Sequence, residues 1–227
     1  MRVVFCLPGN SFTSNFLMSW SKLVDACNKK GISIVISPGV SSHVALARAK
    51  TFGYNALGGE DQKPFGGELE YDYIMCIDSD MVFTPENFFD LLESPHDVTS
   101  GFYAMSDMKH FAVVKDWDTE YFSKNGSFNF LKPEDLEKWK SEKIEKYMPV
   151  VYTGLGWTLI KKGVLEKLKY PVFWSNLQRM KNSDSSKPDL VDMCSEDVSF
   201  FLNLRDAGVN TFLDTKIRVG HEKLIPI

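Results

Sequence analysis

Three short apolar runs, separated by stretches with helical spacing, constrain the fold of this chain more than any other feature. The runs are RVVFCLP at 2–8, ISIVISPG at 32–39 and YIMCI at 73–77. The stretches between them, 13–31 and 41–57, carry apolar residues on one helical stripe. Because consecutive strand–helix–strand units close by right-handed crossovers, the pattern predicts an α/β fold with a central, mostly parallel sheet flanked by helices.

Local signals predict the ends of several helices, and the elements in the second half of the sequence are expected to be of mixed kinds. A helix is predicted after Thr84, with Pro85 in its first turn, and another over 194–208 with Ser195 as N-cap and Gly208 as C-cap. Ser41 or Ser42 is the predicted N-cap of the helix in 41–57. The remaining expectations are strands at 97–105 and 110–117, a charged helix at 133–148, a strand, glycine-rich turn and helix within 149–168, a mobile loop at 176–192, a strand at 211–214 and a tail at 217–227.

Length and composition are those of one ordinary globular domain. The chain has 227 residues, 44% hydrophobic and 25% charged, so a single domain over 1–227 is expected. Its net charge of −4 offers no basic surface for a nucleic acid backbone, and we expect no nucleic acid partner.

The cysteines and the apolar runs indicate the compartment. The four cysteines are scattered without a C-x-x-C pair, which favours a reducing environment. No apolar run approaches the roughly 20 residues of a membrane span or has the form of a signal peptide. We therefore expect a cytoplasmic protein with no transmembrane segment.

Asp78-Ser79-Asp80 is the strongest single candidate for chemistry. The two carboxylates follow the apolar run YIMCI, at the sheet edge where ligands bind in open α/β sheets. Carboxylates of this kind suit Mg²⁺ or Mn²⁺, and such an ion can neutralise a diphosphate. The alternative is a turn in which the aspartates satisfy local backbone donors.

Two further candidates are weaker by themselves. Glu196 and Asp197 lie in the first turn of a predicted helix, where acids either complement the helix dipole or, for Asp197, act as a general base. His221, near the C-terminus, is either a packing residue or an additional ligand for Mn²⁺. No G-x-G-x-x-G follows the first strand and no G-x-x-x-x-G-K-[ST] occurs, so the common dinucleotide and P-loop sites are excluded.

The order of these motifs resembles that of the GT-A fold glycosyltransferases, particularly family 2-like enzymes, including small versions found in viruses and phages. The resemblance rests on LARAKTFGYNAL, YDYIMCIDSDMVFTPENFFDLL, VTSGFYAM, YTGLGWTLIKKGVLEKL, CSEDVSFFLNLRDAG and VGHEKL, in that order, and runs from about Arg2 to Lys223. It implies a Rossmann-like nucleotide-diphospho-sugar transferase fold, with a nucleotide-sugar-binding half at 1–100 and an acceptor-binding half at 101–227. A viral source would place the protein in the host cytoplasm.

The resemblance also implies an activity in glycan biosynthesis. The chain would transfer a sugar from a nucleotide-diphosphate sugar of the UDP, GDP or dTDP type to a glycan or another hydroxyl acceptor. Mn²⁺ or Mg²⁺ would be bound by Asp80, with Asp78 at the ribose or in the metal shell and His221 as a late ligand. The remaining residues implied in donor binding are Pro8, Gly9, Asn10, Arg48 and Ser79.

The acceptor side follows from the same resemblance. Asp197 matches the general base of inverting members, and Glu196 matches the neighbouring acid near the acceptor. In the turn TGLGW, Gly154 and Gly156 would admit a sugar and Trp157 would stack on its apolar face. Independently of the resemblance, the Ser, Asp, Lys and Pro content of the loop 176–192 disfavours independent packing, and the loop is expected to act as a lid over bound substrate.

Other readings remain open on the sequence. A sugar-phosphate nucleotidyltransferase also uses aspartates at a strand end with Mg²⁺, although LPGNSFTSN lacks the lysine or arginine that such enzymes place after their first strand. A catalytically inactive carbohydrate- or nucleotide-binding module is the third reading. Inverting and retaining chemistry are both compatible with the motifs.

Overall fold

The computed structural model describes residues 1–223, and the last four residues of the predicted tail, 224–227, lie outside the described residues. Its central sheet has seven strands in the order β2-β1-β3-β9-β5-β12-β7. In chain order these are β1 (Arg2–Pro8), β2 (Ser33–Gly39), β3 (Tyr73–Ile77), β5 (Val98–Phe102), β7 (Tyr147–Val150), β9 (Trp157–Lys161) and β12 (Thr211–Arg218).

Most of these strands share one direction. β1 pairs in parallel with β2 and β3, and β5 pairs in parallel with β12. β9 runs antiparallel to both β3 and β5, and β7 runs antiparallel to β12. Every strand of this sheet except β9 and β7 therefore points the same way. The prediction of an α/β fold with a mostly parallel sheet is confirmed.

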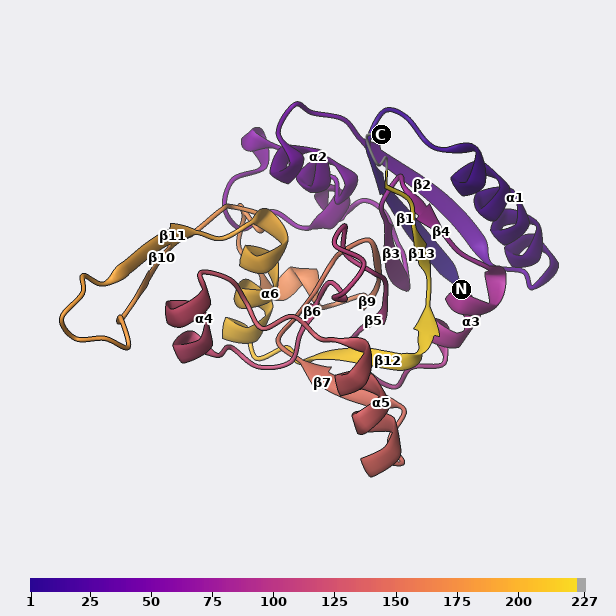
Figure 1. Ribbon diagram of the computed structural model, residues 1–227. Coiled ribbons are helices and arrows are strands. Elements are labelled where there is room, and N and C mark those ends of the chain that lie inside the picture. Colours follow the sequence, from indigo (N-terminus) through magenta and orange to yellow (C-terminus); the bar gives the residue numbers. More distant parts are fainter. Residues whose placement is uncertain (224–227) are drawn as a thin grey trace.

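Helices cover both faces of the sheet (Figure 1). Alternate residues of β1 face opposite sides: Val3 and Phe5 pack with α1 and α3, whereas Val4 and Cys6 pack with α2 and α6. Strands buried on both faces in this way explain the nearly continuous apolar runs in the sequence. The helices are α1 (Ser14–Lys29), α2 (Val44–Thr51), α3 (Pro85–Leu92), α4 (Thr119–Asn125), α5 (Pro133–Glu142) and α6 (Glu196–Asp206).

Helix ends follow local capping chemistry with three departures from expectation. Thr84 caps α3 in a reciprocal capping box with Asn87, as its position before Pro85 indicates. α2 begins after His43 instead of Ser41 or Ser42, and Ser41 accepts a hydrogen bond from the backbone of His43.

α6 has Ser195 at its N-cap position, but the side chain of Ser195 makes no capping hydrogen bond. The C-cap of α6 is Ala207, and Gly208 follows it with a left-handed φ of +74°.

Several predicted elements are shorter or of another kind. The helix predicted over 133–148 ends at Glu142, because Met148 and Val150 alternate inward as part of β7. The helix expected within 149–168 is only a 3₁₀ turn at Leu165–Lys167. The strand predicted at 110–117 is reduced to β6 (Val113–Val114), which pairs with β8 (Tyr152–Thr153).

The segment predicted as a mobile loop at 176–192 contains two paired strands, which the sequence analysis missed, with a loop between them at 181–189. Its strands β10 (Leu177–Met180) and β11 (Leu190–Met193) pair in antiparallel register from Leu177 opposite Met193 to Met180 opposite Leu190. Figure 1 shows the hairpin projecting away from the sheet. Apolar residues interspersed among the polar ones supply the strand signal that overall polarity obscured.

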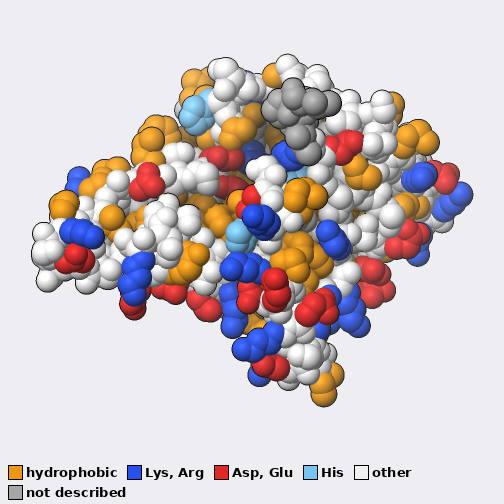
Figure 2. All heavy atoms as spheres, in the orientation of Figure 1, with side chains coloured by type: hydrophobic (Ala, Val, Ile, Leu, Met, Phe, Trp, Pro, Cys, Tyr) orange, Lys and Arg blue, Asp and Glu red, His pale blue; other side chains and the backbone are white. Residues whose placement is uncertain are grey.

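Charged side chains are concentrated on the periphery. Figure 2 shows basic and acidic side chains intermingled over the lower part of the view, where α5 lies in Figure 1. This agrees with the charged, solvated helix predicted there. Among the described residues, no helix is both long and apolar enough to cross a membrane.

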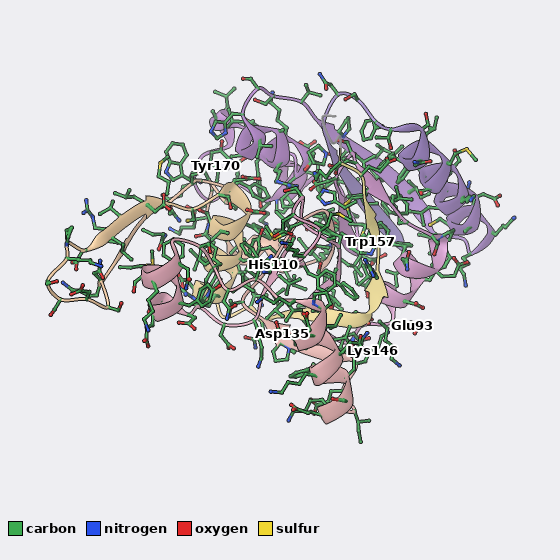
Figure 3. The ribbon with its side chains drawn as sticks, in the orientation of Figure 1. Glu93, His110, Asp135, Lys146, Trp157 and Tyr170 are labelled. Atoms are coloured by element: carbon green, nitrogen blue, oxygen red, sulfur yellow. The ribbon has the colours of Figure 1, made fainter. Side chains whose placement is uncertain are left out.

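An ion pair with a buried carboxylate joins the segment after α5 to the sheet. Asp214 on β12 is fully buried and lies 2.8 Å from the ammonium of Lys146, which Figure 3 labels near α5. We expect Lys146→Met to lower the free energy of unfolding by about 3 kcal/mol, because it leaves a buried carboxylate without its counter-charge. Urea denaturation measures this.

The controls for this substitution separate charge from packing. Lys146→Met combined with Asp214→Asn is expected to recover most of the loss. Lys138→Met, at an exposed lysine of α5 paired loosely with Glu142, is expected to change stability by less than about 0.5 kcal/mol. Equal losses at Lys146 and Lys138 would contradict the importance of the pair.

Candidate functional site

A cavity of about 430 Å³ opens at the carboxyl ends of β1, β2 and β3, the place where open α/β sheets bind ligands. The structure brings into its lining all the residues to which the sequence assigned donor or metal binding: Pro8, Gly9, Asn10, Arg48, Asp78, Ser79, Asp80 and His221. The sequence analysis assigned no binding role to the other lining residues, which are Val40, Ser41, Val44, Ala47, Tyr103 and Lys223.

Asp80 and His221 meet because two short strands pair. β4 (Met81–Val82) runs antiparallel to β13 (Gly220–His221), with His221 opposite Met81. This register places the Nε2 atom of His221 3.2 Å from the Oδ2 atom of Asp80. The Nδ1 atom of His221 lies 2.8 Å from the carbonyl oxygen of Ala104, to which it donates when protonated. In the neutral imidazole, Nε2 is then the nitrogen with a free lone pair on the side of Asp80.

The carboxyl group of Asp80 has a pKa below its ordinary value. Burial raises its pKa, but hydrogen bonds from His221 and from Lys223, whose ammonium lies 2.7 Å from Oδ2, outweigh burial and bring the pKa to about 2. Burial lowers the pKa of His221, and its bonds to Asp80 and Ala104 raise it above the ordinary value. The site therefore holds a negative carboxylate with a basic imidazole beside it at neutral pH.

This geometry fits a divalent cation in part. An oxygen of Asp80 and Nε2 of His221 are an apt pair of ligands for Mn²⁺. Within residues 1–223 no group of three or more potential ligands is assembled, so a cation here would take its other ligands from water or from a bound phosphate. Lys223 would then either share the oxygen of Asp80 with the cation or lose its hydrogen bond to that oxygen.

Asp78 faces a different partner. Its two carboxylate oxygens accept hydrogen bonds from the guanidinium of Arg48, at 2.9 and 3.2 Å. The Nε atom of Arg48 donates to Glu196 at 3.1 Å. Arg48 thus links the end of β3 to the start of α6. Burial lowers the pKa of Arg48, but Asp78 raises it well above its ordinary value, so the group is a permanent cation.

Asp197 lies at the start of α6 with both oxygens engaged. Oδ2 accepts a hydrogen bond from the hydroxyl of Tyr152 at 2.8 Å, and Oδ1 accepts from the hydroxyl of Ser195 and the backbone of Val198. Burial and the neighbouring Asp197 raise the pKa of Tyr152, which keeps its proton on the phenol. Neither Asp197 nor Glu196 lines the cavity, and Glu196 is connected to it through Arg48.

The glycine-rich turn at 153–157 has another role than the one predicted for it. A Cβ atom at Gly154 would lie 1.9 Å from the hydroxyl oxygen of Tyr103, and at Gly156 2.9 Å from it. The backbone of Gly156 donates to that hydroxyl at 3.1 Å. Both glycines therefore make room for the side chain of Tyr103.

Trp157 does not serve as a platform for an acceptor in this structure. Its side chain is 0% exposed and packs against Phe83, with ring centroids 4.6 Å apart. Figure 3 shows Trp157 among the central strands. Because β9 begins at this residue and turns its side chain into the core, the prediction of sugar stacking by Trp157 is wrong.

Three residues of the site went unnoticed in the sequence. Tyr103 packs edge-on against the imidazole of His221, with centroids 4.9 Å apart, and lines the cavity. Lys223 stands two positions after His221, and on an extended segment this spacing puts both side chains on one side. The sequence therefore contained a signal for Lys223 in its spacing from His221. Nothing in the sequence marks Tyr152 as the partner of Asp197.

The sequence matches no protein-family model and no curated protein. The fold is similar to solved structures. The crystal structure of A197 from STIV aligns with 100% of this chain and 98% of its own, at 20% identity and a TM-score of 0.53. GalNAc-T7, solved with UDP, GalNAc and Mn²⁺, aligns with 97% of this chain and 43% of its own, at 10% identity and a TM-score of 0.53.

A third similar structure is the catalytic domain of Drosophila β1,4-galactosyltransferase 7 in complex with xylobiose, which covers 98% of this chain and 71% of its own at 14% identity and a TM-score of 0.47. The chain, with its mostly parallel seven-stranded sheet flanked by helices, has the GT-A glycosyltransferase fold.

Proposed function

We propose that this chain is a metal-dependent glycosyltransferase that moves a sugar from a nucleotide-diphosphate sugar to a hydroxyl acceptor. The observation that carries the proposal is the cavity at the ends of β1 to β3, whose lining contains Asp78, Asp80, His221, Arg48 and Lys223. The half at 1–100 supplies most of the donor cavity, and the half at 101–227 supplies the acids of α6.

On the donor side, Asp80 and His221 would hold Mn²⁺ or Mg²⁺. A bound divalent cation supplies stabilisation of the negative charge that develops on the departing nucleoside diphosphate. The GT-A structure of GalNAc-T7 contains UDP and Mn²⁺, which supports a donor and a cation of this kind for the present chain. Pro8, Gly9 and Asn10 would border the nucleotide.

On the acceptor side, Asp197 is proposed as the general base. An acceptor hydroxyl has a pKa far above 7, so a carboxylate that takes its proton as the new bond forms lowers the barrier. Tyr152, Ser195 and the backbone of Val198 orient this carboxylate. A base opposite the leaving group implies inversion at the anomeric carbon. A glycan is the proposed acceptor.

Thermal denaturation with a panel of nucleotide sugars tests the donor site. Wild type is compared with Asp80→Asn, with and without Mn²⁺. A donor at about 100 times its dissociation constant is expected to add about 2.7 kcal/mol of stability. We expect Mn²⁺ to increase this shift in wild type and to leave it unchanged in Asp80→Asn.

The matched control is Asp90→Asn, at an exposed aspartate of α3 outside the cavity, which should respond like wild type. A Mn²⁺-dependent increase of equal size in Asp80→Asn would contradict the metal site. No shift with any donor would favour the nucleotidyltransferase or the inactive binding module.

A further inference from the structure

The segment that follows β12 forms one wall of the cavity. β13 pairs with β4, and one residue beyond the strand the backbone of Glu222 donates to the carbonyl of Asp80 at 2.8 Å. This bond continues the antiparallel pairing and fixes the direction in which the chain leaves β13. The next side chain, that of Lys223, consequently enters the lining of the cavity beside Asp80.

The carboxylate of Glu222 fastens this segment to the start of α1. One of its oxygens accepts a hydrogen bond from the amide of Asn15 at 2.6 Å, and the other accepts from the hydroxyl of Thr13. Thr13 is the N-cap of α1 and lies three positions after Asn10, which lines the cavity. We call these contacts of Glu222 with Thr13 and Asn15 the clasp. The clasp ties the C-terminal wall of the cavity to the loop that follows β1.

The two permanent cations of the cavity differ in how fully they are engaged. Arg48 is 12% exposed and donates to three carboxylate oxygens of Asp78 and Glu196. Lys223 is 39% exposed and has one partner among the described residues, Asp80. Since an ammonium carries three donors, Lys223 retains donors for a ligand in the cavity.

Charge balance gives Lys223 a role when a phosphorylated ligand enters. Asp78 and Asp80 both line the cavity and would repel an anion, and the charge of Arg48 is already matched by Asp78 and Glu196. A bound cation at Asp80 would repel the ammonium of Lys223. The nearest favourable position for that ammonium is then an oxygen of the phosphate itself.

We infer that Lys223 binds the diphosphate of the donor and that the clasp of Glu222 positions it to do so. This inference rests on the proposed function, because it takes the cavity to be the nucleotide site. It adds a phosphate-binding residue and a positioning residue from the C-terminal wall. The competing explanation is that Lys223 is only a counter-ion that neutralises Asp80.

Titration calorimetry without metal and at low salt tests the inference. The probes are UDP, GDP and dTDP, each paired with its own nucleoside. For the diphosphate that wild type binds best, Lys223→Gln is expected to lower the affinity about tenfold, which is the size of one hydrogen bond to a charged group. The affinity for the nucleoside is expected to stay unchanged. Equal diphosphate affinities of wild type and Lys223→Gln would overturn the inference.

The same comparison in an Asp80→Asn background distinguishes phosphate binding from neutralisation. If Lys223 contacts the phosphates, Lys223→Gln still weakens diphosphate binding when Asp80 carries no charge. If the loss disappears in that background, Lys223 is a counter-ion and the inference is overturned. Should wild type bind none of the three diphosphates, either without metal or with Mn²⁺, the proposed function itself fails, which is a different result from unchanged affinity in the variant.

The clasp and simple electrostatics predict opposite effects of Glu222→Ala on the affinity for the diphosphate. Glu222→Ala removes a negative charge near the cavity, and on charge alone it would strengthen diphosphate binding. We expect it to weaken binding about threefold instead, because Lys223 loses the anchor that directs it. Glu93→Ala, at an exposed glutamate outside the cavity lining that Figure 3 labels, is the control and should bind like wild type. Stronger binding by Glu222→Ala would overturn the positioning role.

Discussion

Asp197→Asn is expected to lower kcat about 10³-fold, within the range that a general base contributes to catalysis. The substitution keeps the size of the side chain and its place at the start of α6. It removes the carboxylate that would take the proton of the acceptor hydroxyl. Donor affinity is expected to stay within about twofold of wild type, because Asp197 does not line the donor cavity.

The measurement is steady-state transfer with the donor identified by thermal denaturation, together with calorimetry of donor binding. Tyr152→Phe is the matched comparison, since it deletes one hydrogen bond to Asp197 but leaves the base. We expect it to cost about tenfold in kcat, the loss of one hydrogen bond to a charged group. Transfer by Asp197→Asn at the rate of wild type would contradict the assignment of the base.

The stereochemistry of the product gives an independent check of the same assignment. A base on the face opposite the leaving group predicts inversion, which proton NMR of the anomeric centre reports directly. Retention would remove the reason for a base at Asp197, even if Asp197→Asn were inactive. Activity and configuration together therefore test both the residue and its role.

The first half of the fold could be predicted because its local signals agree. In β1, β2 and β3 the apolar runs are the strands of the sheet, and Thr84 with Pro85 marks the start of α3. Because these strands are parallel, their carboxyl ends lie at the same edge of the sheet. The gathering of Pro8, Asp78 and Asp80 at one cavity follows from topology alone.

The second half could not be predicted to the same extent because its short elements depend on distant partners. β10 and β11 read as polar loop because a hairpin needs few apolar residues per strand. The stacking role expected of Trp157 came from the resemblance to glycosyltransferases, and it requires an exposed ring. Its burial is decided by Phe83 and by the pairing of β9 with β3, neither of which is visible in the local sequence.

The pairings within the site also depend on tertiary structure. In the sequence, Asp80 and His221 are two separate candidates for metal binding. The pairing of β4 with β13 makes them neighbours. The bridge from Asp78 through Arg48 to Glu196 joins positions that are 30 and 148 residues apart in the chain. No periodicity indicates such a contact, and only the packing of α2 against α6 creates it.

That bridge leads to the second large expected effect. Arg48→Met is expected to lower the free energy of unfolding by about 3 kcal/mol, because it removes the only charge partner that two poorly exposed carboxylates have within residues 1–223. The side chains of Asp78 and Glu196 are 25% and 15% exposed, so water compensates each of them only partly. Their mutual repulsion adds to the cost. Urea denaturation of wild type and variant measures the difference.

Neutralising the two acids tests whether charge is the cause. Arg48→Met together with Asp78→Asn and Glu196→Gln is expected to regain most of the lost stability, since no uncompensated charge then remains. Arg48→Lys should recover only part, because an ammonium cannot reproduce two parallel bonds to Asp78 and a third to Glu196. Arg205→Met, at an exposed arginine paired with its neighbour Asp206, should change stability by less than about 0.5 kcal/mol.

Donor binding by the neutralised triple variant then separates two roles of Arg48. If Arg48 only holds β3 and α6 together, the variant that regains stability should also regain much of its affinity for a nucleoside diphosphate. If the guanidinium itself attracts the diphosphate, affinity stays low although the fold is restored. A triple variant as unstable as Arg48→Met would show that packing of the long side chain, and not its charge, holds α2 against the site.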